Sequence, residues 1–409
     1  MEANDLAILA GVGLVYAMVS RRLGRTIVTS AIVFLTAGIV LGDAVLGWFT
    51  VGPSGAILRL IAESTLALVL FTDASRIDLR TLGRELAVPV RLLAIGLPLT
   101  IVAGVGAALL TVPGLTVVEA ALLAIAVAPT DAALGAAVVS DERVPSRIRQ
   151  GLNVESGLND GLCVPLLLIA LAVASAEGGG ETAPLQLVFE EIGFGVLGGV
   201  VAGGAGAFAL RLARERQWVA SVWAPVVPLM IVGLAYGLAS VLHGSGLIAT
   251  FVAGMAYGTI LAGSDDETAR VAETLGSAMA AVTFFIFGAA ILPITANELS
   301  WEPVLFGVLA VTVVRMLPVA LALAGLRARL PTVAFLAWFG PRGLASIVFA
   351  VLILQGGPLP HLDLILTAIS VTIVISVYAH GITALPLTNR YVAWAAARPR
   401  HALHTTAEG

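Results

Sequence analysis

The sequence predicts an all-α polytopic membrane protein, on three observations: its hydropathy, its long apolar segments and the rhythm of its arginine-rich loops. The chain has 409 residues, 59% of them hydrophobic and 12% charged, and its mean hydropathy is +1.01. Soluble globular domains do not reach these values. The net charge of −4 is thinly spread, so we expect no nucleic-acid partner and membrane lipid as the surroundings.

Long apolar segments follow one another along almost the whole chain. A membrane-spanning helix needs about 20 apolar residues, and by that measure we count about thirteen spans. They cover residues 5–20, 26–43, 56–74, 86–110, 117–139, 151–174, 185–211, 221–242, 245–262, 273–293, 302–325, 332–354 and 362–386. We therefore expect one transmembrane domain over 1–386 and a short cytoplasmic tail over 387–409.

Arginine marks every second loop, and the chain contains no lysine. Clusters follow spans 1, 3, 5, 7 and 11 and close the chain, whereas the loops at 42–54, 176–184 and 295–302 contain no arginine. Because short cytoplasmic loops are enriched in basic residues, the pattern predicts the N-terminus outside and the C-terminus in the cytoplasm of a multi-pass cell-membrane protein. The acidic loop at 264–273, which contains Arg270, is the exception to the rhythm.

Two spans are interrupted by proline next to polar residues. The fifth span contains the run 128–131 around Pro129, and the twelfth contains 340–343 around Pro341. Proline removes a helical hydrogen bond and clashes with the preceding turn, so both helices should break near mid-membrane. They lie seven spans apart, and an odd offset reverses direction in the membrane. We therefore predict inverted repeats over about 26–174 and 245–386, whose paired broken helices point to a transporter's binding site.

The sixth span has a polar group inside an apolar stretch: Glu155, Ser156, Asn159 and Asp160. Ionisable residues at bilayer depth are costly and usually line an ion or substrate path. Residues four apart share a helix face, so Ser156 and Asp160 should lie on one face. Glu155 and Asn159 should lie on the adjoining one.

The other ionisable groups predicted at membrane depth are Asp73, Asp131, Arg315 and Arg342. Four acids against two arginines leave two excess negative charges, which favours a bound cation or proton. Because a buried arginine demands a carboxylate or carbonyls, we pair Arg342 with Glu155 and expect Asp131 and Arg315 at the crossing of the broken helices.

This pairing leaves Asp160, supported by Asp73, as the carboxylate that holds an ion. Hard oxygen ligands suit an alkali cation such as Na⁺: we expect the Asp160 carboxylate, the Ser156 hydroxyl, an unwound carbonyl near Thr130 and water. No resident cofactor is expected. Glu63 is interpreted as a satisfied or pore-lining group, and His243 and His380 as interfacial histidines at helix ends.

The run GLNVESGLNDGLCVPL resembles the Glu-Ser-x-x-Asn-Asp helix of monovalent cation/proton antiporters of the NhaP and NHE type. GPRGLAS resembles that family's Gly-x-Arg-Gly helix, and APTDA, LFTDAS, the Arg315 helix and the His380-Gly381 helix agree as well. The resemblance implies that Asp160 binds the ion and the proton, with Ser156, Thr130 and Asp73 completing or bordering the site. It likewise implies the Glu155–Arg342 bridge, and Asn159 and Asp131 as stabilisers of the crossing.

The resemblance also implies an antiporter fold like that of NhaA and NapA, and a homodimer whose core domain moves against a dimerisation domain. Asp73 departs from relatives that often carry Glu, which puts direct coordination by this shorter arm in question. An Asn159-Asp160 pair replaces the Asp-Asp pair of electrogenic relatives, which also use a membrane lysine. We therefore expect electroneutral exchange of one Na⁺ or Li⁺ for one H⁺.

Four alternatives compete with that hypothesis. A K⁺/H⁺ antiporter of the same fold would use the same residues, because residue types do not reveal cavity size. A cation channel would show a filter loop, and an ion sensor would move no protons. An intramembrane aspartyl protease needs Gly-x-Gly-Asp and Tyr-Asp motifs, which are absent; we expect a transporter and not an enzyme.

Overall fold

The computed structural model describes residues 3–24, 26–50, 56–76, 87–131, 134–135, 138, 141–177, 185–261, 267–326 and 328–397, and every regular element within these ranges is helical. The α-helices of the first half are α1 (Ala3–Leu23), α2 (Ser30–Leu41), α3 (Ala56–Ser75), α5 (Ala87–Arg91), α6 (Leu97–Thr111), α7 (Val117–Ala126) and α9 (Ser146–Glu177). Those of the second half are α10 (Leu185–Glu215), α11 (Val227–Val241), α12 (Gly246–Ile260), α13 (Glu267–Ile286), α14 (Leu292–Thr295), α15 (Trp301–Val311), α16 (Val313–Ala322), α17 (Leu330–Trp338), α18 (Leu344–Gln355) and α19 (Leu362–Ala396).

The helices follow the predicted spans closely. Eight stretches of the described chain are long and apolar enough to cross a membrane, and four shorter apolar helices of 10–17 residues accompany them. π-helical turns at Leu92–Gly96 and Phe287–Ile291 join α5 to α6 and α13 to α14 without a loop. The total of thirteen spans stays a prediction. The last helix runs to Ala396, ten residues beyond the expected end of its span, and 398–409 lie outside the described residues.

The backbone leaves the helix at both predicted breaks. α7 ends at Ala126, and the backbone of 127–131 leaves the helix. α17 ends at Trp338, and α18 begins at Leu344 after a non-helical stretch of 339–343. The first half of each broken helix is held at its start: a capping box of Thr116 and Glu119 begins α7, and proline stands in the first turn of α17. The run 132–140 lies largely outside the described residues.

Small residues let the backbones around α9 approach closely. In α12, Gly254 and Gly258 form a Gly-x-x-x-Gly pair, and a Cβ at either position would clash with α3, at the carbonyl oxygens of Phe71 and Ser75. Such pairs drive helix packing where lipid removes the hydrophobic contribution. Since α3 and α12 both pack against α9, this contact fixes the depth at which Asp73, between Phe71 and Ser75, meets α9.

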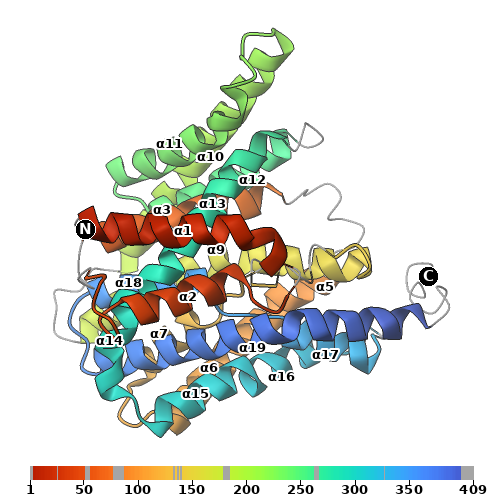
Figure 1. Cartoon of the computed structure of the whole chain (residues 1–409). Helices are drawn as coiled ribbons and strands as arrows, with labels where there is room; N and C mark the ends of the chain where they lie inside the picture. The colour runs from red at the N-terminus through yellow and green to blue at the C-terminus, as the bar shows by residue number, and fades with distance from the viewer. Residues whose placement is uncertain are drawn as a thin grey trace.

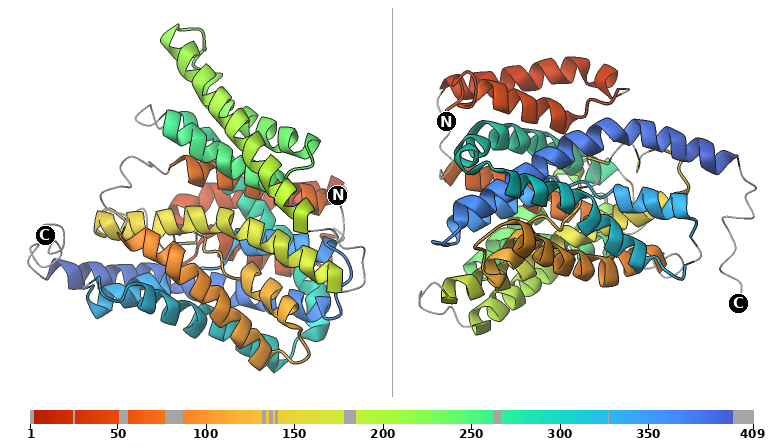
Figure 2. Two further views of the ribbon diagram at one scale, coloured as in Figure 1. Left: turned by 180° about the vertical axis from the view of Figure 1, so that it is seen from behind. Right: turned by 90° about the horizontal axis from the view of Figure 1, so that it is seen from below.

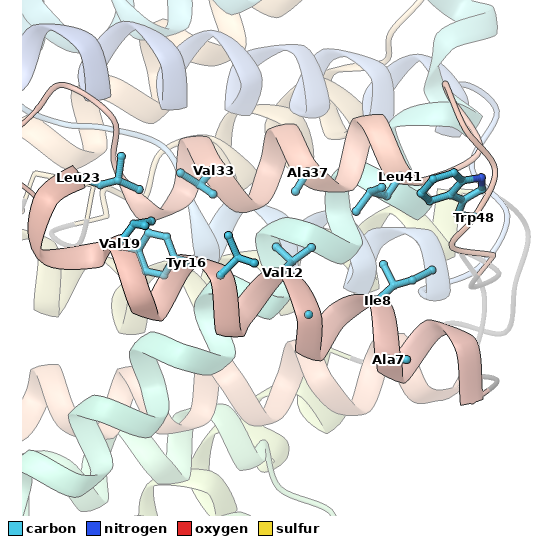
Figure 3. Close-up of a pocket in the computed structure, with 12 residues that line it drawn as sticks. Ala7, Ile8, Val12, Tyr16, Val19, Leu23, Val33, Ala37, Leu41 and Trp48 are labelled. Atoms are coloured by element: carbon cyan, nitrogen blue, oxygen red, sulfur yellow. The ribbon is translucent and has the colours of Figure 1, made fainter.

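At one side of the molecule, α1 packs mainly against α2, and the two helices lie apart from the projecting α10–α11 hairpin (Figures 1 and 2). An apolar groove of about 460 Å³ runs between them, from Ala7 and Trp48 at one end to Leu23 at the other (Figure 3). Aliphatic side chains such as Val15 and Met18 on α1 are 64% and 76% exposed. This face of α1 is suited to contact lipid or another apolar surface.

We predict that Gly258→Ala destabilises the protein by about 1–3 kcal/mol, because the new methyl group has to displace the α3 backbone. Thermal unfolding of the purified protein, followed by tryptophan fluorescence, measures the effect. Gly233→Ala in α11 is the control, since a Cβ there has no atom within 4 Å. Equal stability of the two variants would contradict the close α3–α12 contact.

Candidate ion-exchange site at the crossing of two broken helices

The two breaks meet and satisfy each other's backbone groups. The amide N–H of Asp131 donates to the carbonyl of Pro341 at 2.7 Å, and the N–H of Leu344 donates to Oδ2 of Asp131 at 3.0 Å. The Asp131 carboxylate therefore lies at the N-terminus of α18, where unpaired amides and the helix dipole favour a negative charge. Asp131 therefore lies at the crossing of the two breaks.

Both glycines of the Gly-x-Arg-Gly run, Gly340 and Gly343, are required by close contacts at this crossing. A Cβ at Gly343 would clash with the Asp131 carboxylate, and a Cβ at Gly340 would clash with the guanidinium of Arg315. Each glycine thus allows a charged group to approach the unwound backbone directly. The two glycines of the run are therefore needed for packing at the crossing.

Arg342, 1% exposed, stabilises the end of α7. Its Nη1 donates to the carbonyls of Ala128 and Pro129, at 3.0 and 3.4 Å. A broken helix leaves carbonyls without partners, and a cation there also complements the negative end of the helix dipole. Arg342 therefore serves the crossing.

Glu155 pairs with Arg315, with Oε1 and Nη1 2.5 Å apart and both side chains at most 3% exposed. The expected Glu155–Arg342 bridge is therefore wrong. A break at Thr312 (φ −106°, ψ −96°) separates α15 from α16 and places Arg315 in the first turn of α16, where it meets Glu155 of α9. The guanidinium of Arg342 instead bonds the carbonyls of the first break, so Arg315 has the carboxylate partner that we expected for Arg342.

Thr130 is held from α9 on all three of its polar groups. Its N–H donates to Oδ1 of Asn159 at 3.3 Å, its hydroxyl accepts from Nδ2 of Asn159 at 2.7 Å, and its carbonyl accepts from the Ser156 hydroxyl. Asn159 and Ser156 thus fix the unwound backbone of the first break to α9. Both Asn159 bonds reach the first break, and its stabilising role there stays a prediction.

Asp160 lies one turn beyond Ser156 and is 6% exposed, and its Oδ1 has no hydrogen-bond partner among the described residues. An unpartnered buried carboxylate oxygen is costly unless a proton or a cation occupies it. The nearby carboxylates of Asp73 and Asp131 repel its negative charge further. Both arginines are engaged elsewhere, with Glu155 and with the carbonyls of the first break.

Asp73 approaches the site from α3. A Cβ at Gly157 of α9 would lie 3.3 Å from the Asp73 Cβ, so the absence of a side chain at 157 brings α3 against the turn that carries Asp160. Next to the first break a cavity of about 10 Å³ gives room for about one water molecule. It is lined by Thr130, Asp131, Gly135, Val138, Leu152, Ser156, Phe339 and Pro341.

The surroundings of His380 and Ser376 were not indicated by the sequence, whereas those of Glu63 agree with one of its two readings. His380 is 1% exposed in the middle of α19 and does not lie at a helix end. Ser376, one turn earlier, is also buried, and both bond to the second break. Glu63 is bound by Arg59 at 2.6 Å and by the hydroxyl of Tyr236 at 2.5 Å, which makes it a satisfied polar group.

The comparisons with known proteins agree with this geometry. The family model of the transmembrane sodium/hydrogen exchanger matches residues 7–390. The chain belongs to the sodium/hydrogen exchanger family. Its fold is similar to that of the sodium proton antiporter MjNhaP1 from Methanocaldococcus jannaschii, with a TM-score of 0.76 over 94% of this chain and 97% of that one, at 20% identity. The all-α fold with two broken crossing helices is thereby confirmed.

Among curated relatives, a Na⁺/H⁺ antiporter of Schizosaccharomyces pombe is 27% identical over 59% of this chain and 54% of its own length. A K⁺/H⁺ antiporter NhaP of Alkalimonas amylolytica is 26% identical over 88% of this chain and 63% of its own length. The chain thus spans less than two thirds of either protein.

We predict that Glu155→Gln and Arg315→Met each destabilise the protein by about 3–5 kcal/mol, because each leaves an uncompensated buried charge. The double variant should recover part of this loss. Thermal unfolding of the four proteins gives the coupling energy of the pair. The same cycle with Arg342→Met in place of Arg315→Met should give a smaller coupling energy with Glu155. A larger coupling energy for Arg342 than for Arg315 would restore the pairing expected from the sequence.

Proposed function

We propose that this protein is a secondary transporter that exchanges Na⁺ or Li⁺ for H⁺ across the cell membrane. The observation that carries the proposal is the Asp160 carboxylate, which is buried and whose Oδ1 has no hydrogen-bond partner in the described part of the chain. Family membership supports cation/proton exchange as the class of activity.

The ligands we assign to the transported cation are oxygens that lie around the first break. The Asp160 carboxylate and the Ser156 hydroxyl follow each other on one face of α9, and Ser156 bonds the Thr130 carbonyl directly. A hydroxyl that donates to a carbonyl keeps its own lone pairs available, so Ser156 and Thr130 can both offer oxygen to an alkali ion. Water and Asp73 complete or border this set.

Exchange follows if the cation and the proton compete for Asp160. When Na⁺ leaves, the buried carboxylate repelled by Asp73 and Asp131 is left uncompensated, and a proton neutralises it. Binding of one ion thus requires release of the other, and the empty, charged carboxylate resists crossing the low-dielectric barrier. Alternating access then moves one ion in each direction per cycle.

Because Asn159 carries no charge and the chain has no lysine, we propose one cation per proton. The alternative is exchange of K⁺ for H⁺ by the same residues. It is favoured by one observation, namely that the Alkalimonas amylolytica relative, which matches 88% of this chain, is named a K⁺/H⁺ antiporter.

We also propose a homodimer in the cell membrane, with the N-terminus outside and the C-terminus in the cytoplasm. The arginine pattern of the loops supports this orientation. The exposed aliphatic face of α1, beside its groove with α2, supports contact with lipid or with a second copy (Figure 3).

We predict that the protein in proteoliposomes collapses an imposed proton gradient when Na⁺ or Li⁺ is added, and that Asp160→Asn abolishes the response because an amide neither ionises nor takes up a proton. A pH-sensitive dye inside the vesicles measures it, with Na⁺, Li⁺ and K⁺ added in turn. Asp363→Asn, which alters an exposed carboxylate in the first turn of α19, is the control and should exchange normally. No response of the wild-type protein to any alkali cation would remove the proposal.

The proposed stoichiometry predicts that the exchange rate does not change when a membrane potential is imposed with a potassium ionophore in a Na⁺/H⁺ assay. Competition for Asp160 further predicts that the apparent affinity for Na⁺ falls as the pH is lowered. Initial rates at several pH values and potentials test both statements. Acceleration by voltage would show that a second carboxylate, Asp131 or Asp73, takes part in the cycle.

A further inference from the structure

The second break is held by two buried side chains of α19. The carbonyl of Trp338, the last residue of α17, accepts from Nε2 of His380 at 2.9 Å. The N–H of Arg342, at the other end of the break, donates to the Ser376 hydroxyl at 2.5 Å. Ser376 and His380 therefore bridge both sides of the unwound segment.

Both ring nitrogens of His380 are hydrogen-bonded. Nε2 faces the Trp338 carbonyl, which only accepts, so Nε2 carries a hydrogen and donates it to the second break. Nδ1 lies 3.1 Å from the Ser376 hydroxyl and 3.0 Å from the Ser376 backbone carbonyl. Ser376 therefore holds the ring on α19 while Nε2 reaches the break.

The same arrangement occurs, with different chemistry, at the first break. Ser156 and Asp160 lie four residues apart on α9, and Ser376 and His380 lie four residues apart on α19. Ser156 bonds the backbone of Thr130, which follows Pro129, just as Ser376 bonds the backbone of Arg342, which follows Pro341. In the inverted repeat, His380 thus occupies the register that Asp160 occupies on α9.

We infer that His380 is a positioning residue for exchange, at the place on α19 that corresponds to Asp160 on α9. It fixes the second break so that the guanidinium of Arg342 stays on the carbonyls of Ala128 and Pro129. Those carbonyls immediately precede Thr130, so a shift of Arg342 reaches the cation site. The inference rests on the proposed assignment of Asp160 as the ion-binding group.

A series at position 380 tests the inference by Na⁺/H⁺ exchange in proteoliposomes, with KM for Na⁺, Vmax and the pH profile as readouts. His380→Ala should raise the KM for Na⁺ about three- to tenfold, the effect of losing one buried neutral hydrogen bond, and leave the midpoint of the pH profile in place. His380→Gln should restore most of the affinity, since its amide nitrogen reaches the position of Nε2. His380→Asn, whose amide is too short, should not.

Two further variants separate positioning from general damage to α19. Ser376→Ala should raise the KM in the same direction as His380→Ala, and the double variant should be less than additive because both act on one break. Ser370→Ala is the matched control: it removes a buried hydroxyl of the same helix that has no hydrogen-bond partner among the described residues, and should leave exchange unchanged.

The inference is overturned if His380→Gln shifts the midpoint of the pH profile, which would make His380 a proton carrier. It is equally overturned if His380→Ala lowers only the yield of folded protein while KM stays at the wild-type value, which would make the contact merely structural. Asp160→Asn is measured in parallel. Retained exchange in that variant would refute the assignment of Asp160, independently of the outcome at position 380.

Discussion

Two helices that end in the middle of a membrane must satisfy their terminal backbone groups without water, and the rest of this structure depends on that constraint. Each free carbonyl or amide in hydrocarbon costs several kcal/mol. Here Arg342 donates hydrogen bonds to the carbonyls that precede Thr130, and the Asp131 carboxylate accepts one from the amide of Leu344. The charges of the crossing are thus tied to the backbone before any ion binds.

This division of roles leaves the Asp160 carboxylate with an unpartnered oxygen. Glu155 neutralises Arg315, Arg342 complements the carbonyl end of α7, and Asp131 complements the amide end of α18. Asp160 lies on the same helix as Ser156 and Asn159, and these two side chains donate hydrogen bonds to Thr130. Asp160, which we propose exchanges ions, therefore lies on α9 next to the unwound backbone at Thr130. Its neighbours Ser156 and Asn159 fix the position of that backbone.

Much of this arrangement could be predicted from the sequence, because it depends on local signals. Pro129 and Pro341 predict the two breaks. The four-residue spacing of Ser156 and Asp160 predicts that they share one face of α9. The partner of Glu155 could not be predicted, because two buried arginines are candidates for it. Which of them pairs with Glu155 depends on the helix break at Thr312, and no proline or glycine in the sequence marks that break. His380 was missed for a similar reason, because hydropathy ended its span at 386 whereas the helix continues to Ala396.

The comparison of the two breaks explains why a symmetric architecture can hold an asymmetric site. Both breaks are fixed by a serine from the helix that follows them, Ser156 on α9 and Ser376 on α19. At the next turn α9 carries an acid with an unpartnered oxygen, and α19 carries an imidazole with both nitrogens bonded. An acid at both positions would double the uncompensated charge at the crossing, beside a backbone that already needs Arg342 for its carbonyls. A hydrogen-bonded histidine on α19 instead adds no second carboxylate to the crossing, so that the exchange we propose takes place at α9 alone.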